Sequence, residues 1–594
     1  MKKRIADIIM ETLVENGITD AFCVVGGGSM HLDNAIGINP DINVIFNNHE
    51  QACAMACEGY ARTCGKMALC LVTSGPGGTN TLTGVMGAYQ DSIPMIIISG
   101  QVRYATTIAE SGLNLRRRGE QEFDIINSVQ NMTKYAKMIT NPLSIKQEVQ
   151  HAIDVAMSGR RGPVWLDIPL DIQAAEVEEE SLLPALPKPN IIKCSDSDFN
   201  ELKDLIKNAK APCFLAGSAV SSTRSQEKFL RVLEKWQVPT VTATCVCDVL
   251  YNDHPLYFGT TGGVGTRAGN FVMQNSDVLV VFGSSLGFKQ TTFDQSAFAP
   301  NSKVIMIDVN PDEAKKSGLN IYKFIHSDII NIFDKILNDE EISVDKNWLA
   351  HCNKLKNKFE FFENAIGKPE ERVNIYNFWK KYAELESDEN VTILGNSSCI
   401  TPRLQYNNTK AKQLTFTNIN CGSMGWDIPS ALGSSVAYKK PVTIASGDGS
   451  FMMNLQELQT IKHNNLPVRI MLFSNNGYRA IEQTCNNYFN GLKVGCTPES
   501  GLSMPNFENV AKAFDFPYKK CSTNAELENS INWLLSQNSY CILEVEQFYP
   551  MLPAPLLKPR LNEDGTTAKI NFFDMYPFLN KETIEECIYK VKDK

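Results

Sequence analysis

Residues 442–477 read VTIASGDGSFMMNLQELQTIKHNNLPVRIMLFSNNG and contain two apolar, Val- and Ile-rich runs separated by a helical stretch. The first run ends in Gly447-Asp448-Gly449-Ser450, and the second, Val468–Ser474, leads into Asn475-Asn476-Gly477. Short apolar runs that alternate with helical stretches are typical of parallel sheets whose two faces are covered by helices. The segment therefore predicts part of a doubly wound α/β domain.

The same alternation recurs along the chain, in the runs Ala68–Val72, Met95–Ser99, Val278–Gly283 and Val304–Asp308. A chain of 594 residues is too long for one core. Segments typical of linkers, Glu176–Ser197 and Asp339–Lys346, divide it. We predict α/β domains with doubly wound parallel sheets over residues 1–175, 190–338 and 365–550. For the proline- and aromatic-rich tail, 551–594, we expect packing over another domain; a poorly ordered terminus is the alternative.

Composition excludes several classes of protein. The net charge is −9, which leaves no basic surface typical of a nucleic-acid-binding protein. No segment strings together the ~18 apolar residues needed to cross a bilayer, and the first ten residues do not resemble a secretory signal. The 17 cysteines are scattered through apolar stretches, which favours reduced thiols in the cytoplasm. No paired Cys or His spacing typical of a protein-only zinc site occurs.

The two turns of the opening segment carry the strongest chemical signal. Glycines permit a tight strand-to-helix turn, and the helix that begins near Ser450 directs amide donors at an anion. Mg²⁺ prefers oxygen ligands and is often held by one or two protein groups together with phosphates, which suits Asp448, Asn475 and a nearby carbonyl. The pattern therefore predicts a site for magnesium and phosphate, with two ordinary turns as the alternative.

A second signal is Glu50, in His49-Glu50-Gln51-Ala52. This glutamate follows the strand-like run Val44–Asn48 and opens a helix rich in alanine and cysteine, where a carboxylate would be poorly solvated. On its own the residue could equally be an acid at a helix N-terminus that the helix dipole stabilises.

Together, these elements resemble the thiamine-diphosphate enzymes, in particular the acetohydroxyacid synthase and pyruvate oxidase branch, from about Arg4 to Pro555. The resemblance implies a pyrimidine-binding domain first, a flavin-domain-like domain second and a diphosphate- and Mg²⁺-binding domain third. It implies that Glu50 comes from the opposite subunit and contacts the aminopyrimidine of the cofactor. A homodimer is then the smallest active form, and a homotetramer is consistent with the family.

The resemblance assigns further roles by position. Met424 matches the methionine beneath the bent cofactor, and Gln121 matches a glutamine near the substrate. Gly422 lies where a backbone carbonyl receives the 4'-amino group. The cofactor-binding set that we expect comprises Gly26, Gly27, Gly28, Glu50, Gly395, Asn396, Ser397, Gly422, Met424, Gly447, Asp448, Gly449, Ser450, Asn475, Gly477, Tyr478 and Ile481, with Asp448, Asn475 and Gly477 on the metal.

The implied activity is decarboxylation of a 2-keto acid, pyruvate first, and transfer of the two-carbon unit to a carbonyl acceptor. Glu120 and Thr484 replace two aromatic residues of the synthases, which predicts a larger, more polar acceptor site. The tail motif Pro577-Phe578-Leu579 resembles a subgroup associated with bacterial surface-polysaccharide biosynthesis. The acceptor is then either a second 2-keto acid or a keto sugar nucleotide. A non-ligating decarboxylase or oxidase, or a catalytically silent homologue, is the alternative.

The middle domain resembles the flavin-holding domain of this branch through Gly259-Thr260-Thr261-Gly262-Gly263, Gly283 and Asp308. It departs from that pattern at two positions, where Ser285 replaces an arginine and Val264 replaces a histidine. Lys289 is a candidate to supply the missing charge. The sequence leaves open whether FAD is bound or whether the domain has kept the fold and lost the flavin.

Overall fold

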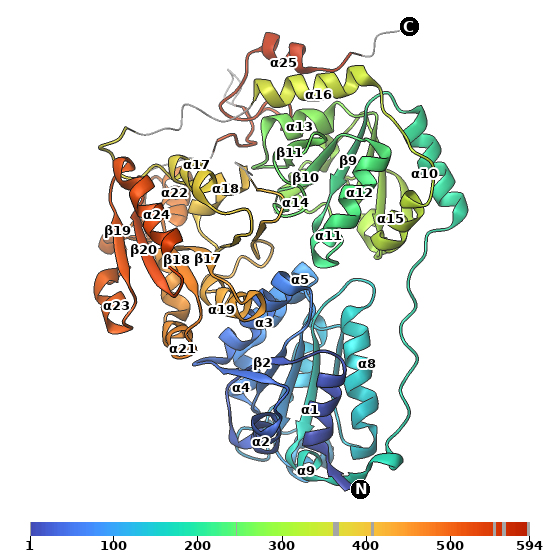
Figure 1. Ribbon diagram of the computed structural model, residues 1–594, viewed down its shortest axis with the longest axis vertical. Helices are drawn as coiled ribbons and strands as arrows, with labels where there is room; N and C mark the ends of the chain where they lie inside the picture. Colours follow the sequence, from blue (N-terminus) through green and yellow to red (C-terminus); the bar gives the residue numbers. More distant parts are fainter. Residues whose placement is uncertain are drawn as a thin grey trace.

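The chain folds into three six-stranded parallel sheets, each covered by helices on both faces (Figure 1). The computed structural model describes residues 2–244, 246–359, 368–405, 409–549, 554–560 and 566–590. The predicted α/β class with three doubly wound sheets is confirmed. Among the described residues, no helix combines the length and the apolar character that crossing a bilayer requires.

The N-terminal sheet has the order β3-β2-β4-β5-β7-β6. Its strands are β2 (Asp20–Cys23), β3 (Asn43–Phe46), β4 (Leu69–Val72), β5 (Ile96–Gln101), β6 (Tyr135–Met138) and β7 (Val164–Pro169). The helices that cover it include α1 (Ile5–Glu15), α2 (Met30–Ile38), α3 (Glu50–Cys64), α5 (Leu82–Asp91) and α8 (Ile145–Met157). The predicted runs Ala68–Val72 and Met95–Ser99 correspond to β4 and β5, and the strand-like run Val44–Asn48 overlaps β3.

The C-terminal sheet has the order β16-β15-β17-β18-β20-β19, the same connectivity as the N-terminal sheet. Its strands are β15 (Val391–Leu394), β16 (Leu414–Phe416), β17 (Val442–Gly447), β18 (Val468–Ser474), β19 (Tyr518–Cys521) and β20 (Cys541–Glu546). Its helices include α17 (Ile375–Leu385), α19 (Asp427–Tyr438), α20 (Asp448–Phe451), α22 (Arg479–Tyr488) and α24 (Leu527–Ser536).

The central sheet differs in order, β11-β10-β9-β12-β13-β14, which is the order of dinucleotide-binding folds. Its strands are β9 (Pro212–Ala216), β10 (Thr240–Ala243), β11 (Tyr257–Thr261), β12 (Val278–Phe282), β13 (Lys303–Asp308) and β14 (Ile321–His326). Its helices include α10 (Asp196–Asn208), α12 (Gln226–Trp236), α13 (Arg267–Gln274), α15 (Ile329–Leu337) and α16 (Lys346–Lys358).

Helices α3 and α19 cross at very short range and join the outer domains (Figure 1). A Cβ atom on Gly59 would lie 2.1 Å from the carbonyl oxygen of Ser430, and one on Gly433 would lie 1.9 Å from that of Ala56. Glycine inside a helix is destabilising by about 1 kcal/mol relative to alanine, so the close crossing explains both residues. One apolar core, which includes Phe22, runs through this crossing into both sheets.

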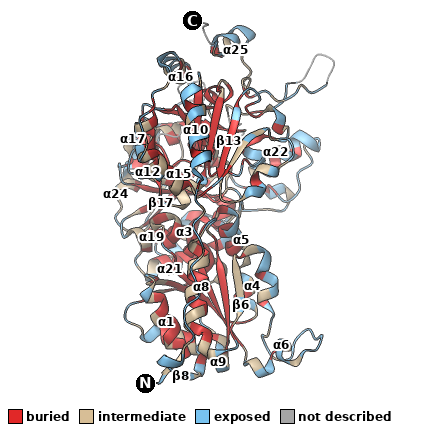
Figure 2. Cartoon of the chain, turned by 90° about the vertical axis from the view of Figure 1, so that its right-hand side faces the viewer, coloured by how far each residue is buried: buried red, intermediate tan, exposed pale blue. Residues whose placement is uncertain are grey.

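The chain leaves the N-terminal domain through β8 (Glu176–Glu178), which pairs with β1 (Lys2–Arg4), and then runs extended to α10 (Figure 1). Strands and crossing helices are largely buried, whereas the region of α6 (Ile108–Ser111) projects as an exposed lobe (Figure 2). This lobe precedes the segment that carries Gln121.

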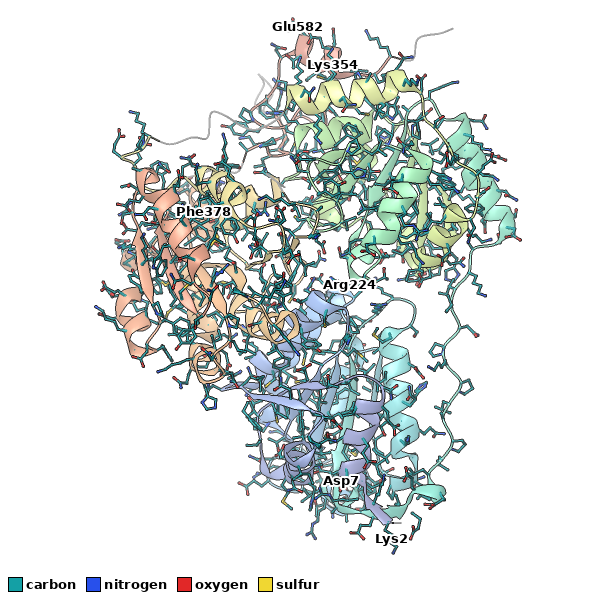
Figure 3. The ribbon with its side chains drawn as sticks, viewed as in Figure 1. Lys2, Asp7, Arg224, Lys354, Phe378 and Glu582 are labelled. Atoms are coloured by element: carbon teal, nitrogen blue, oxygen red, sulfur yellow. The ribbon has the colours of Figure 1, made fainter. Side chains whose placement is uncertain are left out.

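The tail packs on the central domain. Arg267 Nη1 donates to the carbonyl oxygen of Met575 at 2.9 Å, and the backbone N–H of Leu557 donates to that of Gly263 at 2.8 Å. Helix α25 (Lys581–Cys587) lies over α16, with Glu582 and Lys354 at the same end of the molecule (Figure 3). Residues 551–553, 561–565 and 591–594 of the predicted tail lie outside the described residues.

Candidate active site

The carboxyl edge of the C-terminal sheet brings Asp448 and Asn475 together. Asp448 opens α20 directly after β17, and its Oδ2 accepts from the backbone N–H groups of Asn475 at 3.0 Å and Asn476 at 2.7 Å. Burial raises the pKa of Asp448, while these backbone donors lower it. The strand order reverses between β15 and β17, so this is the switch point where open α/β sheets bind ligands.

The loop after β18 is built to offer oxygen atoms. Asn475 Oδ1 is buried and accepts no hydrogen bond, which leaves it free to coordinate a cation. Gly477 has φ of +149°, and a Cβ there would lie 2.3 Å from the carbonyl oxygen of Cys496. Among the residues that the structure describes, no group of three or more His, Cys, Asp or Glu side chains could hold a metal. The donor set therefore fits Mg²⁺ completed by phosphate oxygens.

Three glycines of this edge have no room for a side chain. A Cβ on Gly449 would lie 2.1 Å from Tyr478 Cε1 and 3.2 Å from Met424 Cε, so these two side chains converge on the turn. A Cβ on Gly447 would lie 2.7 Å from Ser397 Oγ, and one on Gly395 would lie 2.2 Å from Asp427 Oδ2. The edge is therefore a cradle whose backbone a ligand can approach closely.

The loop that carries Met424 is supported from its own domain. Asn396 Nδ2 donates to the carbonyl oxygen of Ser423 at 2.8 Å and also to Asn418 Oδ1. The backbone N–H of Gly425 donates to Ser450 Oγ at 2.9 Å. Asn396 and Ser450 therefore hold the loop, and the side-chain amide of Asn396 donates to residues of its own domain.

The remaining predicted residues of this domain lie around the same edge. Gly422 is exposed with φ of +66°, a conformation that favours glycine. Ile481, one turn after Tyr478 along the chain, is half exposed on α22. Asp427 was not predicted: it is buried at the start of α19 and accepts from the hydroxyls of Ser446 and Ser450. The sequence feature that could have pointed to Asp427 is its position as the first residue of a helix.

Glu50 lies at the carboxyl edge of the N-terminal sheet as the first residue of α3. It is partly buried, and its Oε2 accepts from Asn80 Nδ2 at 2.9 Å. Within the described part of the chain, this is the one hydrogen bond of the Glu50 side chain, and it stays inside the N-terminal domain. The carboxylate is therefore available to a group outside its own domain.

Gln121 is exposed with φ of +59°. Its carbonyl oxygen would lie 2.7 Å from a Cβ on Gly75, and a Cβ on Gly77 would lie 3.8 Å from Glu50 Oε1. The Gly75–Gly77 turn thus lies between Gln121 and Glu50. The structure brings both predicted catalytic residues to one edge of the N-terminal sheet.

The triple-glycine loop lies at the same edge. The backbone N–H of Gly26 donates to Asp33 Oδ2 at 3.0 Å, and that of Gly28 donates to Thr73 Oγ1 at 3.0 Å. A Cβ on Gly26 would lie 2.5 Å from Thr73 Cβ, whereas Gly27 faces open space. Gly26 and Gly28 are therefore required by contacts within the domain, and Gly27 is free of such contacts.

A crevice opens at the switch point of the central sheet, between β9 and β12. Gly283, Asp308 and Asp328 line it, together with Arg160 and Arg161 from the N-terminal domain. Burial raises the pKa of Asp308. Sequence reasoning missed the two arginines because they belong to another domain. Lys289, considered as a source of positive charge, instead donates to the carbonyl oxygen of Ile419 at 2.9 Å.

These features define a class of protein. Two doubly wound domains have equal connectivity, one with Glu50 at its carboxyl edge and one with the Asp448 and Asn475 turns, and this framework is that of thiamine-diphosphate enzymes. The chain belongs to the thiamine pyrophosphate enzyme family: the models for the N-terminal TPP binding domain, the central domain and the C-terminal TPP binding domain match residues 3–128, 199–332 and 395–545.

Curated relatives refine this assignment. The chain is 28% identical over 576 residues to the chloroplastic acetolactate synthase of Arabidopsis thaliana, which covers 92% of this chain and 83% of that protein. It is 29% identical over 566 residues to a probable acetolactate synthase large subunit of Methanococcus aeolicus, covering 90% of each. It is 28% identical to the acetolactate synthase isozyme 1 large subunit of Escherichia coli K12, covering 92% and 95%. The protein is therefore an acetolactate-synthase-like, thiamine-diphosphate-dependent enzyme.

Proposed function

We propose that this enzyme decarboxylates pyruvate, or a closely related 2-keto acid, and transfers the two-carbon unit to a carbonyl acceptor. The observation that carries the proposal is the pair of Asp448 and Asn475 at the switch point of the C-terminal thiamine-diphosphate-binding domain. In this pair the buried Oδ1 atom of Asn475 accepts no hydrogen bond. The bound cofactor supplies a C2 carbanion that adds to the ketone and a thiazolium that accepts electrons as carbon dioxide leaves.

The side chains divide the remaining work. Asp448, Asn475 and the carbonyl of Gly477 would hold Mg²⁺, whose charge would neutralise the diphosphate. Met424 would support the cofactor, because its thioether fills space without offering a competing base. Glu50 exchanges a proton with the aminopyrimidine, and Gln121 orients the substrate.

We infer that Glu50 serves a cofactor bound to a second subunit. This is supported by the hydrogen bonding of its carboxylate, which within the described chain accepts only from Asn80 and from no residue of the C-terminal domain. Apolar side chains around α22, including Tyr488 and Phe489, are well exposed in the single chain and suit burial by a partner. A homodimer is then the smallest active form.

For the acceptor, we favour a keto sugar nucleotide over a second 2-keto acid. Glu120 is exposed beside Gln121, and Arg116 and Arg117, on the same loop, are exposed and have no ion pair among the described residues. Such a loop suits a diphosphate-bearing acceptor. Thr484 contributes less polarity than the sequence implies, because its hydroxyl donates to the carbonyl oxygen of Ala480 at 3.2 Å.

FAD is the second cofactor that we propose, in the crevice of the central domain. Its fit is supported by the dinucleotide-type strand order, by Gly283 at the switch point and by the cations of Arg160 and Arg161. Arg160 is paired with Glu313 at 2.9 Å, so Arg161 is the arginine that would supply positive charge where Ser285 has none. The purified protein should then be yellow and release a flavin on acid denaturation; release of an adenine nucleotide without flavin would contradict this assignment.

The deciding experiment supplies thiamine diphosphate, Mg²⁺ and pyruvate, with either a 4-keto sugar nucleotide or a second 2-keto acid, and measures carbon dioxide and products. Glu50→Gln should slow carbon dioxide release about 100-fold or more, while Glu508→Gln, at an exposed surface pair, should not. A coupled sugar product supports the favoured acceptor. Acetolactate as the only product would identify an ordinary acetolactate synthase, and acetaldehyde as the only product would identify a decarboxylase. Absence of carbon dioxide would refute pyruvate as the donor.

A further inference from the structure

Both ends of the loop that carries Met424 are attached to the N-terminal domain of the same chain. At the start of the loop, Asn420 Nδ2 donates to Asp91 Oδ1 at 2.6 Å. At its end, Trp426 Nε1 donates to Glu58 Oε2 at 2.8 Å. Gly422 and Met424 lie between these two attachments, so the path of the loop depends on where the two carboxylates are held.

One arginine holds both carboxylates. Arg62 donates to Glu58 Oε1 from Nε at 2.9 Å and from Nη2 at 2.7 Å, and its Nη2 also donates to Asp91. The guanidinium group is planar and directs its donors in a rigid fork, so it fixes the separation of its two partners. It also lies 5.7 Å from the centroid of the Trp426 ring, within the range of a cation–π contact.

The network is buried, and none of its three residues has a role in the function proposed above. The Glu58 side chain is fully buried, and that of Arg62 is 12% exposed. Burial raises the pKa of Glu58, while Arg62 lowers it. Apolar packing and the glycine crossing of α3 and α19 already join the two domains, so the charged groups are not required simply to hold them together. Buried ionic groups are poor sources of net stability but can define geometry.

The opposite side of the loop is held by the C-terminal domain. Asn454 Nδ2 donates to the carbonyl oxygen of Gly425 at 2.7 Å, and Asn396 donates to that of Ser423 at 2.8 Å. The loop is therefore fixed between its own domain and the carboxylates of α3 and α5. Near the same junction, Arg224 of the central domain lies against the N-terminal domain, with its Nη1 3.4 Å from the carbonyl oxygen of Arg62 (Figure 3).

We propose that Glu58, Arg62 and Asp91 form a positioning clamp that fixes residues 420–426, and through them Met424 and the backbone of Gly422, for catalysis. This inference rests on the proposed function, in which Met424 supports the bent cofactor. The three residues touch neither cofactor nor substrate in this account and are positioning residues. Their effect should therefore fall on turnover rather than on retention of the cofactor, which the Asp448 site provides.

The test compares Glu58→Gln and Trp426→Phe with a matched control, Glu386→Gln. Glu386 is a buried carboxylate that accepts from buried Arg403 at 3.0 Å in the C-terminal domain, with no hydrogen bond to residues 420–426. Both test variants should lower kcat per folded protein about 10- to 100-fold, because small misplacements near reacting atoms are costly. Affinity for thiamine diphosphate with Mg²⁺ should change less than about threefold. The control should be destabilised but should keep its kcat.

A second readout does not depend on activity. Backbone amide exchange of residues 418–428, followed by mass spectrometry in the cofactor-free protein, should accelerate in both clamp variants and not in Glu386→Gln. The clamp would be overturned if both clamp variants kept wild-type amide exchange and a kcat within about twofold of wild type. It would also be overturned if Glu386→Gln lost as much kcat as the clamp variants. If wild-type protein releases no carbon dioxide, the proposed function fails, while amide exchange still decides whether the clamp exists.

Discussion

The two outer sheets share one connectivity but present different chemistry at corresponding edges. By strand order, β2, β3 and β4 correspond to β15, β16 and β17. Directly after β4 the chain presents Thr73-Ser74-Gly75, and directly after β17 it presents Asp448-Gly449-Ser450. The hydroxyl residue Thr73 follows one strand where the carboxylate Asp448 follows the other, so one turn is neutral and the other is the turn for which we propose a metal. The fold thus provides equivalent positions, and the residues at the strand ends decide what each position does.

The connections after β3 and β16 differ in length. Only residues 47–49 separate β3 from α3, whereas residues 417–426 separate β16 from α19. The short connection starts a helix at the sheet edge and presents Glu50 as its first residue. The long connection makes room for the loop with Gly422 and Met424. A change of loop length at one position therefore accounts for an acid at the edge of one sheet and, at the edge of the other, the loop for which we propose contact with the cofactor.

The largest effect is expected from Asp448→Ala, which would make the C-terminal turn as neutral as its N-terminal counterpart. Loss of a carboxylate that carries the metal should weaken Mg²⁺-dependent binding of thiamine diphosphate by a factor of about 100 or more. Titration calorimetry with and without Mg²⁺ measures this. Asp312→Ala, at an exposed pair with Lys315, is the control. Unchanged affinity in Asp448→Ala would remove the metal site and the distinction between the two sheets.

A smaller effect is expected from Gly449→Ala. The added Cβ would lie 2.1 Å from Tyr478 Cε1 and must displace that ring and Met424. We expect kcat to fall about tenfold or more, since displaced groups at the site are no longer aligned. Steady-state kinetics at saturating cofactor measures it. Gly37→Ala, on α2 with nothing within 4 Å, should keep full turnover; equal behaviour of the two variants would show that the cradle tolerates a side chain.

The smallest effect on turnover is expected from Asp167→Asn in β7, which alters the stability of the N-terminal sheet. Burial raises the pKa of Asp167 to about 7, although the hydrogen bonds that Ser99 and Gln101 donate to this carboxylate act to lower it. The unfolded carboxyl ionises near pH 4, so the stabilising contribution of the neutral acid is complete below that pH and is lost as the pH rises to about 7.

This loss corresponds to roughly 4 kcal/mol across the window. Urea unfolding at several pH values should therefore show wild type losing stability relative to Asp167→Asn between about pH 4 and pH 7, with no further change above. Parallel pH profiles for the two proteins would mean that Asp167 is ionised in the folded state.

Local patterns were sufficient for much of this structure. The runs Met95–Ser99 and Val468–Ser474 form strands, and the turns with Asp448 and Asn475 meet because parallel strands end at one edge. The equal connectivity of the outer sheets could not be predicted, since strand order depends on long-range pairing. Arg160 in the central crevice and Glu58 beneath Trp426 were missed for the same reason: each acts on a segment more than a hundred residues away, and no local spacing records such contacts.

Helix α3 begins with Glu50 and carries Glu58 two turns later, and its crossing with α19 leaves no space for adjustment. In the proposed homodimer, the first residue would serve the partner's cofactor while the second holds the loop beneath the chain's own. One rigid helix would then belong to two active sites at once. Such an arrangement favours protomers that work out of phase: filling one site would bias the geometry of the other, and half-of-the-sites reactivity would follow from the architecture itself.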